Sequence, residues 1–105
     1  MVITDPKSTV ADMTLEQHHQ TTRDHMLKQM SNSSATTTVP VTIDGHSALQ
    51  DELTGTQQGS NVVFLHTTVD AGDSFQQILA WTLKSRWAAN RSELADITKS
   101  LHSEE

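Results

Sequence analysis

The chain has 105 residues, with 13 acidic and 7 basic side chains, a net charge of −6 and no cysteine. Without a cluster of lysine and arginine, an acidic chain lacks the main driving force for binding nucleic acid or an anionic membrane, and the absence of cysteine excludes disulfides, thiolate metal sites and a cysteine nucleophile. Even with glycine included, the apolar share is about 38%, below the roughly 45–50% of typical domains, so the core is small or is completed by a second subunit.

The length predicts a single domain over residues 1–105. No basic segment followed by an apolar run is found near residue 1, so the sequence predicts no signal peptide. A cytoplasmic location is expected if the chain is complete, and a periplasmic or lipid-anchored one if a leader was removed. The longest apolar run, residues 62–65, is far shorter than the ~20 residues that span a bilayer, so we expect no membrane insertion.

The first strongly predicted element is a helix over residues 14–30. Thr14 and Gln17 have the spacing of a capping box, in which the hydroxyl accepts from a backbone amide and the glutamine returns a bond to the cap residue. Recurrence at helical spacing places a moderately hydrophobic set on one face: Leu15, His19, Thr22, Met26 and Met30. We expect this face to pack against a sheet.

Small hydroxyl and amide residues fill residues 31–38. Such side chains compete with helix hydrogen bonds, so the sequence predicts that the first helix stops there. Apolar and polar positions alternate over residues 39–43, which predicts a half-buried strand. Pro40 lacks an amide donor and therefore favours an edge position for this strand.

Asp44 and Gly45 form the dipeptide favoured in two-residue hairpin turns. The strand returning from this turn is expected over residues 46–53, with Leu49 and Leu53 directed inward. The segment therefore predicts an antiparallel hairpin.

A second turn is predicted over residues 54–60, which are rich in glycine, glutamine and hydroxyl side chains. β-Branched and aromatic residues then predict two further strands, over residues 61–69 and 75–83. Both have apolar residues on both faces, so we place them centrally, covered above and below. Large residues share one side of the later strand: Phe75, Leu79, Trp81 and Leu83.

The last part of the chain predicts a helix with four apolar residues on one face: Trp87, Leu94, Ile97 and Leu101. Asn90 is placed to cap its main segment, and Glu93 lies near the positive end of the helix dipole. We expect this helix to close over the sheet.

Two segments of the sequence resemble segments that occur in the same order in one group of proteins. They are FQQILAWTLKSRWAANRSELADITKSL at residues 75–101 and, more weakly, VTIDGHSALQDEL at residues 41–53. In this order the chain resembles the PsbP-like superfamily, which includes a photosystem accessory protein, a yeast Ran-binding nuclear import factor, DcrB-type lipoproteins and type VI secretion chaperones. The resemblance implies an α+β fold, an antiparallel sheet of about four or five strands with a helix from the N-terminal region and a C-terminal helix packed on it.

Members of this superfamily usually begin with a hairpin that carries an aromatic motif, followed by a strand leading into the first helix. Here residues 2–4 are at best that strand, so the resemblance implies a single PsbP-like domain, residues 1–105, that lacks the usual opening hairpin. Such a sheet would expose an edge and an apolar strip. We therefore expect a homodimer, in which a second copy covers them by sheet pairing or by exchange of an element.

Three histidines of the first helix raise the question of a metal site: His18, His19 and His25. A helical pair chelates at i, i+4, but Thr22 and Arg23 stand four residues after His18 and His19. His18 and His25 share a face, yet roughly 10 Å of helix separates them, too far for one ion. The sequence therefore predicts a solvated, weakly titrating helix face, with no metal and no cofactor.

Motifs for catalysis are incomplete in this sequence. The segment around Ser74 resembles the start of the GDSL hydrolases, which need a later Asp-x-x-His pair, but His102 is the one histidine after Ser74 and no aspartate stands three residues before it. A Gly-rich phosphate loop is also absent from the sequence. His66 lies within a predicted strand, where a satisfied, partly buried histidine is favoured over an acid or base in a cleft.

These observations favour a non-catalytic protein-interaction or accessory module, with no catalytic residue and with a second copy or another protein as its partner. The alternatives are a small-molecule-binding protein, with a pocket between sheet and helix near Trp81 and Trp87, and a small hydrolase using Ser74 or His66. The residues expected in a pocket or interaction surface are His66, Trp81, Arg86 and Trp87. Fold analogy alone is weak support for any function.

Overall fold

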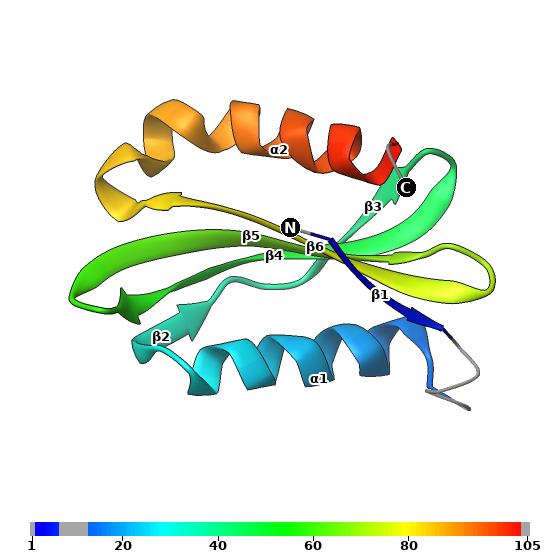
Figure 1. The fold of residues 1–105 in the computed structure, drawn as a ribbon, viewed down its shortest axis with the longest axis horizontal. Helices are drawn as coiled ribbons and strands as arrows, with labels where there is room; N and C mark the ends of the chain where they lie inside the picture. The colour runs from blue at the N-terminus through cyan, green and yellow to red at the C-terminus, as the bar shows by residue number, and fades with distance from the viewer. Residues whose placement is uncertain (1, 7–12, 104–105) are drawn as a thin grey trace.

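An antiparallel sheet lies between two helices, one on each face (Figure 1). The computed structural model describes residues 2–6 and 13–103. The strands are β1 (Val2–Pro6), β2 (Ser31–Ala35), β3 (Val39–Ile43), β4 (His46–Gln57), β5 (Ser60–Asp70) and β6 (Ser74–Leu83). The helices are α1 (Leu15–Lys28) and α2 (Trp87–Ser103), and a short 3-10 turn, Lys84–Arg86, joins β6 to α2.

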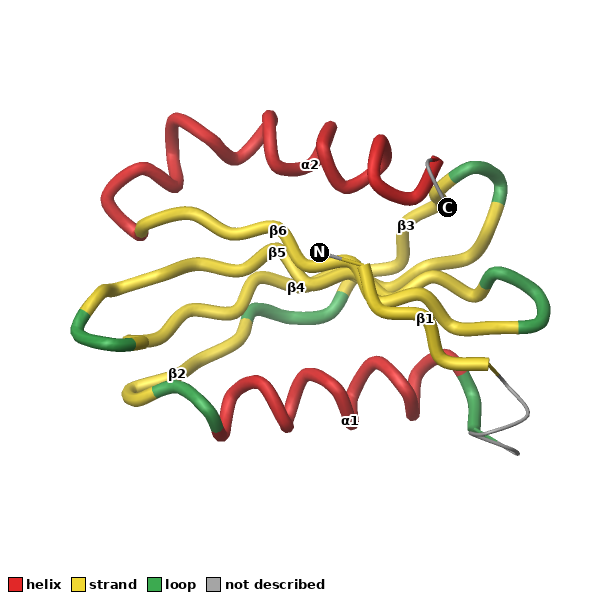
Figure 2. The backbone as a smooth tube through the Cα atoms, in the orientation of Figure 1, coloured by secondary structure: helices red, strands yellow, loops and turns green. Residues whose placement is uncertain are grey.

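The sheet has six strands in the order β1-β6-β5-β4-β2, and β3 also pairs with β4, on the same edge as β2. The backbone trace shows α1 and α2 running along opposite faces of this sheet (Figure 2). The predicted α+β class with an antiparallel sheet and two packed helices is therefore confirmed. The expected number of strands, four or five, is wrong, because the segment after α1 forms an additional strand, β2.

Two tight turns set the register of the three strands β3, β4 and β5. Asp44 and Gly45 have φ angles of 50° and 77°, which a type I′ hairpin requires at both central positions, so this predicted turn is confirmed. The next turn is confined to Gln58 and Gly59, with φ angles of 52° and 81°. The turn expected over residues 54–60 is therefore wrong, and β4 continues to Gln57 because its β-branched threonines suit a strand.

The extra length of β4 explains why the polar segment after α1, where the sequence predicts only the end of the helix, forms a strand. β2 pairs with β4 between Leu53 and Thr56, so a distant strand edge, which the local sequence does not reveal, supplies its backbone hydrogen bonds. Gly55 lies in this stretch, and a Cβ at that position would be 2.8 Å from the Cβ of Met30. Glycine therefore lets the chain at the end of α1 approach β4 closely.

The start of α1 has the predicted capping box. The Thr14 hydroxyl accepts from the amide of Gln17 at 3.2 Å, and the Thr14 amide donates to Gln17 Oε1 at 2.9 Å. His18 and His19 follow at once, and both are buried. The expectation of a solvated histidine face is wrong for these two residues, because the first turns of α1 lie directly on the sheet.

Alternation along the strands divides the core into two sides. The side under α1 has one buried cluster, Met30, Leu53 and Val62, with Met26, Leu27 and Phe64 packed against it. The side facing α2 has two: Leu65, Ala80 and Leu94, and Ile43, Ala48, Val69 and Ile78. Since a buried large apolar side chain contributes roughly 1.5–3 kcal/mol, both helices are needed to complete the core.

α2 begins at Trp87, so Asn90 lies inside the helix and is not the cap that the sequence predicts. Its side-chain amide instead donates to Thr82 Oγ1 of β6 at 3.1 Å. Trp87 packs toward the sheet with Leu94, whereas Ile97 is 40% exposed, so the predicted apolar face is wrong at Ile97. The Leu101 side chain, also expected on that face, lies outside the described residues.

No helix in the described part of the chain is long and apolar enough to cross a membrane.

Candidate functional site

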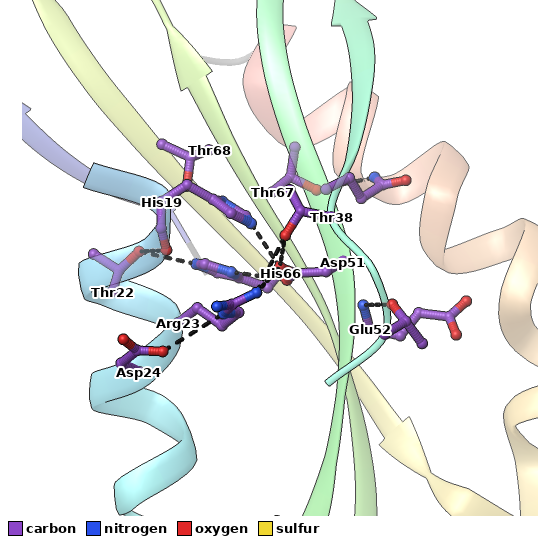
Figure 3. Close-up of polar contacts among 12 residues, drawn as sticks. His19, Thr22, Arg23, Asp24, Thr38, Asp51, Glu52, His66, Thr67 and Thr68 are labelled. Carbon is purple, nitrogen blue, oxygen red and sulfur yellow. Dashed lines mark hydrogen bonds and ion pairs between the residues drawn. The ribbon is translucent and has the colours of Figure 1, made fainter. Parts of the chain in front are cut away.

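A buried polar cluster lies between the first half of α1 and the middle of the sheet (Figure 3). It consists of His19 from α1, Asp51 from β4 and His66 from β5, which are 2%, 2% and 0% exposed. Asp51 and His66 are direct cross-strand partners, and strand alternation directs both side chains toward α1. The cluster therefore ties the helix to two strands.

The carboxylate of Asp51 is at the centre of the cluster. Its Oδ2 lies 2.8 Å from His19 Nε2 and accepts from the Thr38 hydroxyl at 2.9 Å. Its Oδ1 lies 3.2 Å from His66 Nδ1. The two imidazoles stack on each other, with 4.4 Å between their centroids and 20° between their planes. Both carboxylate oxygens are thus in contact with a ring nitrogen.

Threonine hydroxyls lie at the outer nitrogen of each ring. His19 Nδ1 is 2.7 Å from Thr68 Oγ1, and His66 Nε2 is 3.2 Å from Thr22 Oγ1. The Thr22 hydroxyl also lies 3.0 Å from each of the backbone carbonyl oxygens of His18 and His19. Each imidazole is therefore held at both nitrogens, which fixes the orientation of its ring.

Charge in this cluster is set by burial and by the hydrogen bonds to Asp51. Burial alone would raise the pKa of Asp51, but the hydrogen bonds to His19 and His66 outweigh it and hold this pKa well below its usual range. Burial lowers the pKa of His66, and its hydrogen bond to Asp51 offsets part of that effect. Arg23 Nη1 lies 3.9 Å from Asp51 Oδ2, so the carboxylate has one partly exposed cation nearby.

The structure brings together histidines that the sequence analysis treated separately. His66 is hydrogen-bonded at both ring nitrogens, as the sequence reading favours, but it is fully buried, so the expectation that it lines a pocket or an interaction surface is wrong. Its partners Asp51 and Thr22 were missed. The signal for Asp51 was its position between Leu49 and Leu53, which places it on the same side of β4 as Leu53, a core residue of the α1 side.

The other two helix histidines have separate environments. His18 Nε2 lies 2.8 Å from Asp5 Oδ2 of β1, and the His18 ring stacks on Phe75 at 4.8 Å between centroids. His25 is exposed and lies 3.0 Å from the Gln29 side chain. These contacts give no shared site for His18 and His25.

A groove of about 320 Å³ lies beside the C-terminal half of α1. The residues that line it come from β1, from α1 and the chain just after it, from the end of β4 and from the interiors of β5 and β6: Ile3, His25, Met26, Gln29, Met30, Gln57, Phe64, Gln77 and Leu79. None of these is an acid, a lysine or an arginine, although 19% of the chain is charged. The groove is therefore apolar with a neutral polar rim.

Trp81 extends the apolar surface beyond this groove. It is 58% exposed, on the same face of the sheet as Phe64, with 6.4 Å between their ring centroids. Leu83 and Ile3 are also exposed, at 38% and 37%. The expectation that β6 is covered above and below is wrong at Trp81, because α1 lies over β4 and β5 and does not reach this edge.

The edge of β6 beside Trp81 is open within the described chain. β1 pairs with β6 only from Ser74 to Ile78. Residues 80–83 therefore have β5 as their one described neighbouring strand. An apolar side-chain stripe and an open backbone edge occur together here.

Trp87 and Arg86, the other expected surface residues, lie elsewhere. Trp87 packs with the buried pair Leu65 and Ala80 on the side covered by α2, opposite to the side of Trp81. The two tryptophans therefore share no pocket, because Trp81 points to the α1 side and Trp87 is on the other. Arg86 is exposed in the 3-10 turn.

Ser74, the residue considered for a hydrolase, is buried at the start of β6. Its neighbour Phe75 points to the α1 side, where it stacks on His18. Adjacent strand residues point to opposite faces, so the Ser74 side chain is directed away from the imidazole of His18 and from the buried cluster.

Comparisons with known proteins identify a similar fold. No family model matches the chain, and no curated protein matches it. A crystal structure from Pseudomonas aeruginosa, of a protein of unknown function whose suggested role is that of a regulator, is similar with a TM-score of 0.74. The sequences are 9% identical, and the similarity covers 93% of this chain and 68% of that chain. At this identity the similarity shows the fold alone.

Proposed function

We propose that the chain is a non-catalytic protein-interaction module that binds an apolar, uncharged segment of another protein. The observation that carries this proposal is the neutral groove beside α1, which continues into the exposed Trp81 and the β6 edge at residues 80–83, where no second strand pairs within the described chain. Contiguous apolar surface on a folded chain usually marks an interaction site.

The lining of the groove favours an apolar partner segment. Met26 and Met30 form the wall on the α1 side, and methionine is flexible enough to pack against varied shapes. Phe64 and Leu79 come from the adjacent strands β5 and β6, and the neutral side chains at the rim offer no charge for an ion pair. A charged segment would lose hydration there without gaining a partner.

The backbone favours a segment in extended conformation. A peptide that pairs with residues 80–83 of β6 would add a strand to the sheet and gain main-chain hydrogen bonds. Its side chains on one face would then lie against Trp81 and Leu83, since these two residues point to the same side. Backbone pairing supplies affinity and the apolar stripe supplies specificity.

The buried cluster supports a non-catalytic function. His19, Asp51 and His66 contact one another and the surrounding threonines, and little of their surface can reach a substrate. The Ser74 side chain points away from the imidazole of His18. The resemblance to the PsbP-like superfamily fits the same proposal, since that group includes accessory proteins and chaperones.

A second copy of the chain is the other partner that the sequence analysis expects. The same β6 edge and the exposed Trp81 could pair two protomers across a two-fold axis. Light scattering at micromolar concentration tests this directly. A dimer that becomes monomeric in Trp81→Ala supports the homodimer, and a monomeric native chain rejects it.

A small molecule is the remaining occupant of the groove. Its volume of about 320 Å³ is at the lower end of the roughly 300–1,000 Å³ of ligand pockets. A thermal-shift screen with apolar small molecules tests this alternative, because a ligand bound to the folded chain must raise the melting temperature.

The fluorescence of Trp81 tests the favoured proposal. In Trp87→Phe, Trp81 is the sole tryptophan, and a capped peptide of alternating valine and threonine serves as the probe. Pairing with β6 buries Trp81 and shifts its emission to shorter wavelength. A peptide of the same composition with a central proline is the control, because proline cannot extend the ladder. Equal shifts with both peptides, or none with either, would contradict the proposed edge pairing.

A further inference from the structure

We propose that His19, Asp51 and His66 form a binding site for a divalent transition-metal ion, with Zn²⁺ as the ion that fits best. One ligand atom from each residue lies within 4.8 Å of the other two. The set combines two imidazoles with one carboxylate, a donor set that Zn²⁺, Co²⁺ and Fe²⁺ accept in proteins. This site is independent of the groove and of its proposed partner.

The distances around Asp51 suit neighbouring ligands of one ion. His19 Nε2 is 2.8 Å from Oδ2, and His66 Nδ1 is 3.2 Å from Oδ1. With metal–ligand bonds of about 2.0–2.1 Å, neighbouring ligand atoms in a tetrahedral site are about 3.3 Å apart. Small side-chain movements would therefore bring all three groups onto one ion.

The outer hydrogen bonds have the arrangement expected around metal-bound histidines. A ligating histidine usually uses its second ring nitrogen for a hydrogen bond that sets the ring orientation. Thr68 Oγ1 has this position for His19 at 2.7 Å, and Thr22 Oγ1 has it for His66 at 3.2 Å. In both rings the nitrogen left over is the one that faces Asp51.

The hydrogen bonds of Thr22 allow His66 Nδ1 to bind a metal ion. Its hydroxyl has one hydrogen, and two carbonyl oxygens that can accept it lie at 3.0 Å, those of His18 and His19. With the hydrogen directed to the helix backbone, Thr22 Oγ1 accepts from the Nε2–H of His66. In this arrangement a neutral His66 has no hydrogen on Nδ1, and this is the tautomer in which Nδ1 can bind a metal ion. In the other neutral tautomer, Nδ1–H donates to Asp51 Oδ1 and the Thr22 hydroxyl donates to Nε2, so the cluster is satisfied when no ion is bound.

His66 Nδ1 faces Asp51 Oδ1, an acceptor 3.2 Å away, in a fully buried place. In the metal-binding tautomer, His66 Nδ1 and Asp51 Oδ1 both direct lone pairs to the space between them, as two ligands of one ion do. A metal ion satisfies both acceptors and leaves the Thr22 hydrogen on the backbone.

The positive charge of Arg23 repels a cation bound at Asp51. The position of Arg23 also indicates how an ion enters the cluster. Its Nη1 is 3.9 Å from Asp51 Oδ2, a loose contact, and the side chain is 23% exposed. Its Nε also lies 3.6 Å from Asp24 Oδ1, a partner at the surface. A hollow of about 360 Å³, lined by His19, Arg23 and Thr38 among others, leads to the cluster. Movement of Arg23 toward Asp24 would open this path.

The test uses the full chain after dialysis against a chelator. Co²⁺ is added as a spectroscopic probe and Zn²⁺ is titrated by calorimetry. We expect one equivalent of Zn²⁺ to bind, and Co²⁺ to give the visible absorption bands of a low-coordinate nitrogen and oxygen site. Zn²⁺ should also raise the melting temperature of the native chain by mass action.

Four variants make the test specific. His66→Ala should lose Zn²⁺ binding, Thr22→Val should weaken it about 10- to 100-fold by removing an outer hydrogen bond, and Arg23→Gln should tighten it. The matched control is His46→Ala, which removes a histidine at the start of β4. This variant should bind Zn²⁺ like the native chain.

Two results would overturn the proposal. One is no Zn²⁺ binding by the native chain. The other is an unchanged affinity in Thr22→Val together with an unchanged affinity in Arg23→Gln. Because these two substitutions remove no ligand, they decide the question even if His66→Ala does not fold.

Discussion

Two regions under α1 differ in almost every physical respect. The first turns of the helix cover the cluster around Asp51, which is polar, closed to solvent and satisfied within the chain (Figure 3). The later turns border a groove that is apolar, uncharged and open, beside the exposed Trp81. Along this one helix, the residues that carry chemistry are buried under its first turns, and the surface available for binding lies beside its later turns.

The separation has an energetic reason. A buried polar group is costly unless it is hydrogen-bonded, so the cluster must be completed from inside the chain, as the contacts of Asp51 show. An exposed apolar surface has no such requirement, and a partner that covers it gains free energy from the area removed from water. The closed region therefore stabilises the fold, and the open region is available for binding.

The largest effect is expected from Asp51→Ala. This change leaves His19, His66 and Thr38 without their shared acceptor in a buried place, and loss of one member of a buried charged network typically costs about 3–5 kcal/mol. Urea unfolding of the metal-free chain measures it.

Glu52→Ala is the matched control, because Glu52 is the next acid along β4 and pairs with the exposed Arg91 on the other side of the sheet. Its loss should cost about 1 kcal/mol or less. Equal destabilisation by both substitutions would show that the buried cluster contributes no more to the free energy of unfolding than a surface ion pair does.

A smaller effect is expected from Gly55→Ala, which tests how tightly the chain at the end of α1 is packed. The added Cβ would lie 2.8 Å from Met30 Cβ, and overpacking of this kind costs about 1–3 kcal/mol. Thermal unfolding followed by circular dichroism measures the change. Glycine-to-alanine substitutions without a clash usually stabilise, so an unchanged or raised melting temperature would contradict the close approach of Met30 to β4.

The smallest effect on stability is expected from Trp81→Ala. The side chain is 58% exposed, so the free energy of unfolding should change by about 1 kcal/mol or less. In a background with Phe at position 87, which removes the other tryptophan, binding of the valine–threonine peptide followed by calorimetry should fall at least about tenfold. Strong destabilisation by Trp81→Ala would mean that this residue belongs to the core and not to an interface.

Local signals in the sequence predicted the elements that depend on local chemistry. The capping box of Thr14 and Gln17 and the turn at Asp44 and Gly45 were both readable, because each rests on the conformation of a few adjacent residues. β2 was not readable, since its polar residues form a strand only because the edge of β4 is next to them.

The sequence did not reveal the buried cluster because the predicted turn, over residues 54–60, is longer than the turn in the structure, which is confined to Gln58 and Gly59. A turn confined to Gln58 and Gly59 makes Asp51 the cross-strand partner of His66, whereas a turn over residues 54–60 leaves that pair undefined. The approach of His19 depends on where α1 lies on the sheet, and strand patterns carry no such information. The apolar side of β6 was predicted correctly, but the exposure of Trp81 again depends on the position of a helix.

Site-specific photo-crosslinking in the source cells tests whether Trp81 lies in an interface with another protein. A photoreactive phenylalanine analogue is placed at position 81, and at position 97, an exposed apolar site on α2, as the control. The proposed interface predicts a discrete product with one other protein at position 81 and not at position 97. Identical products at both positions, or no product at position 81, would contradict it.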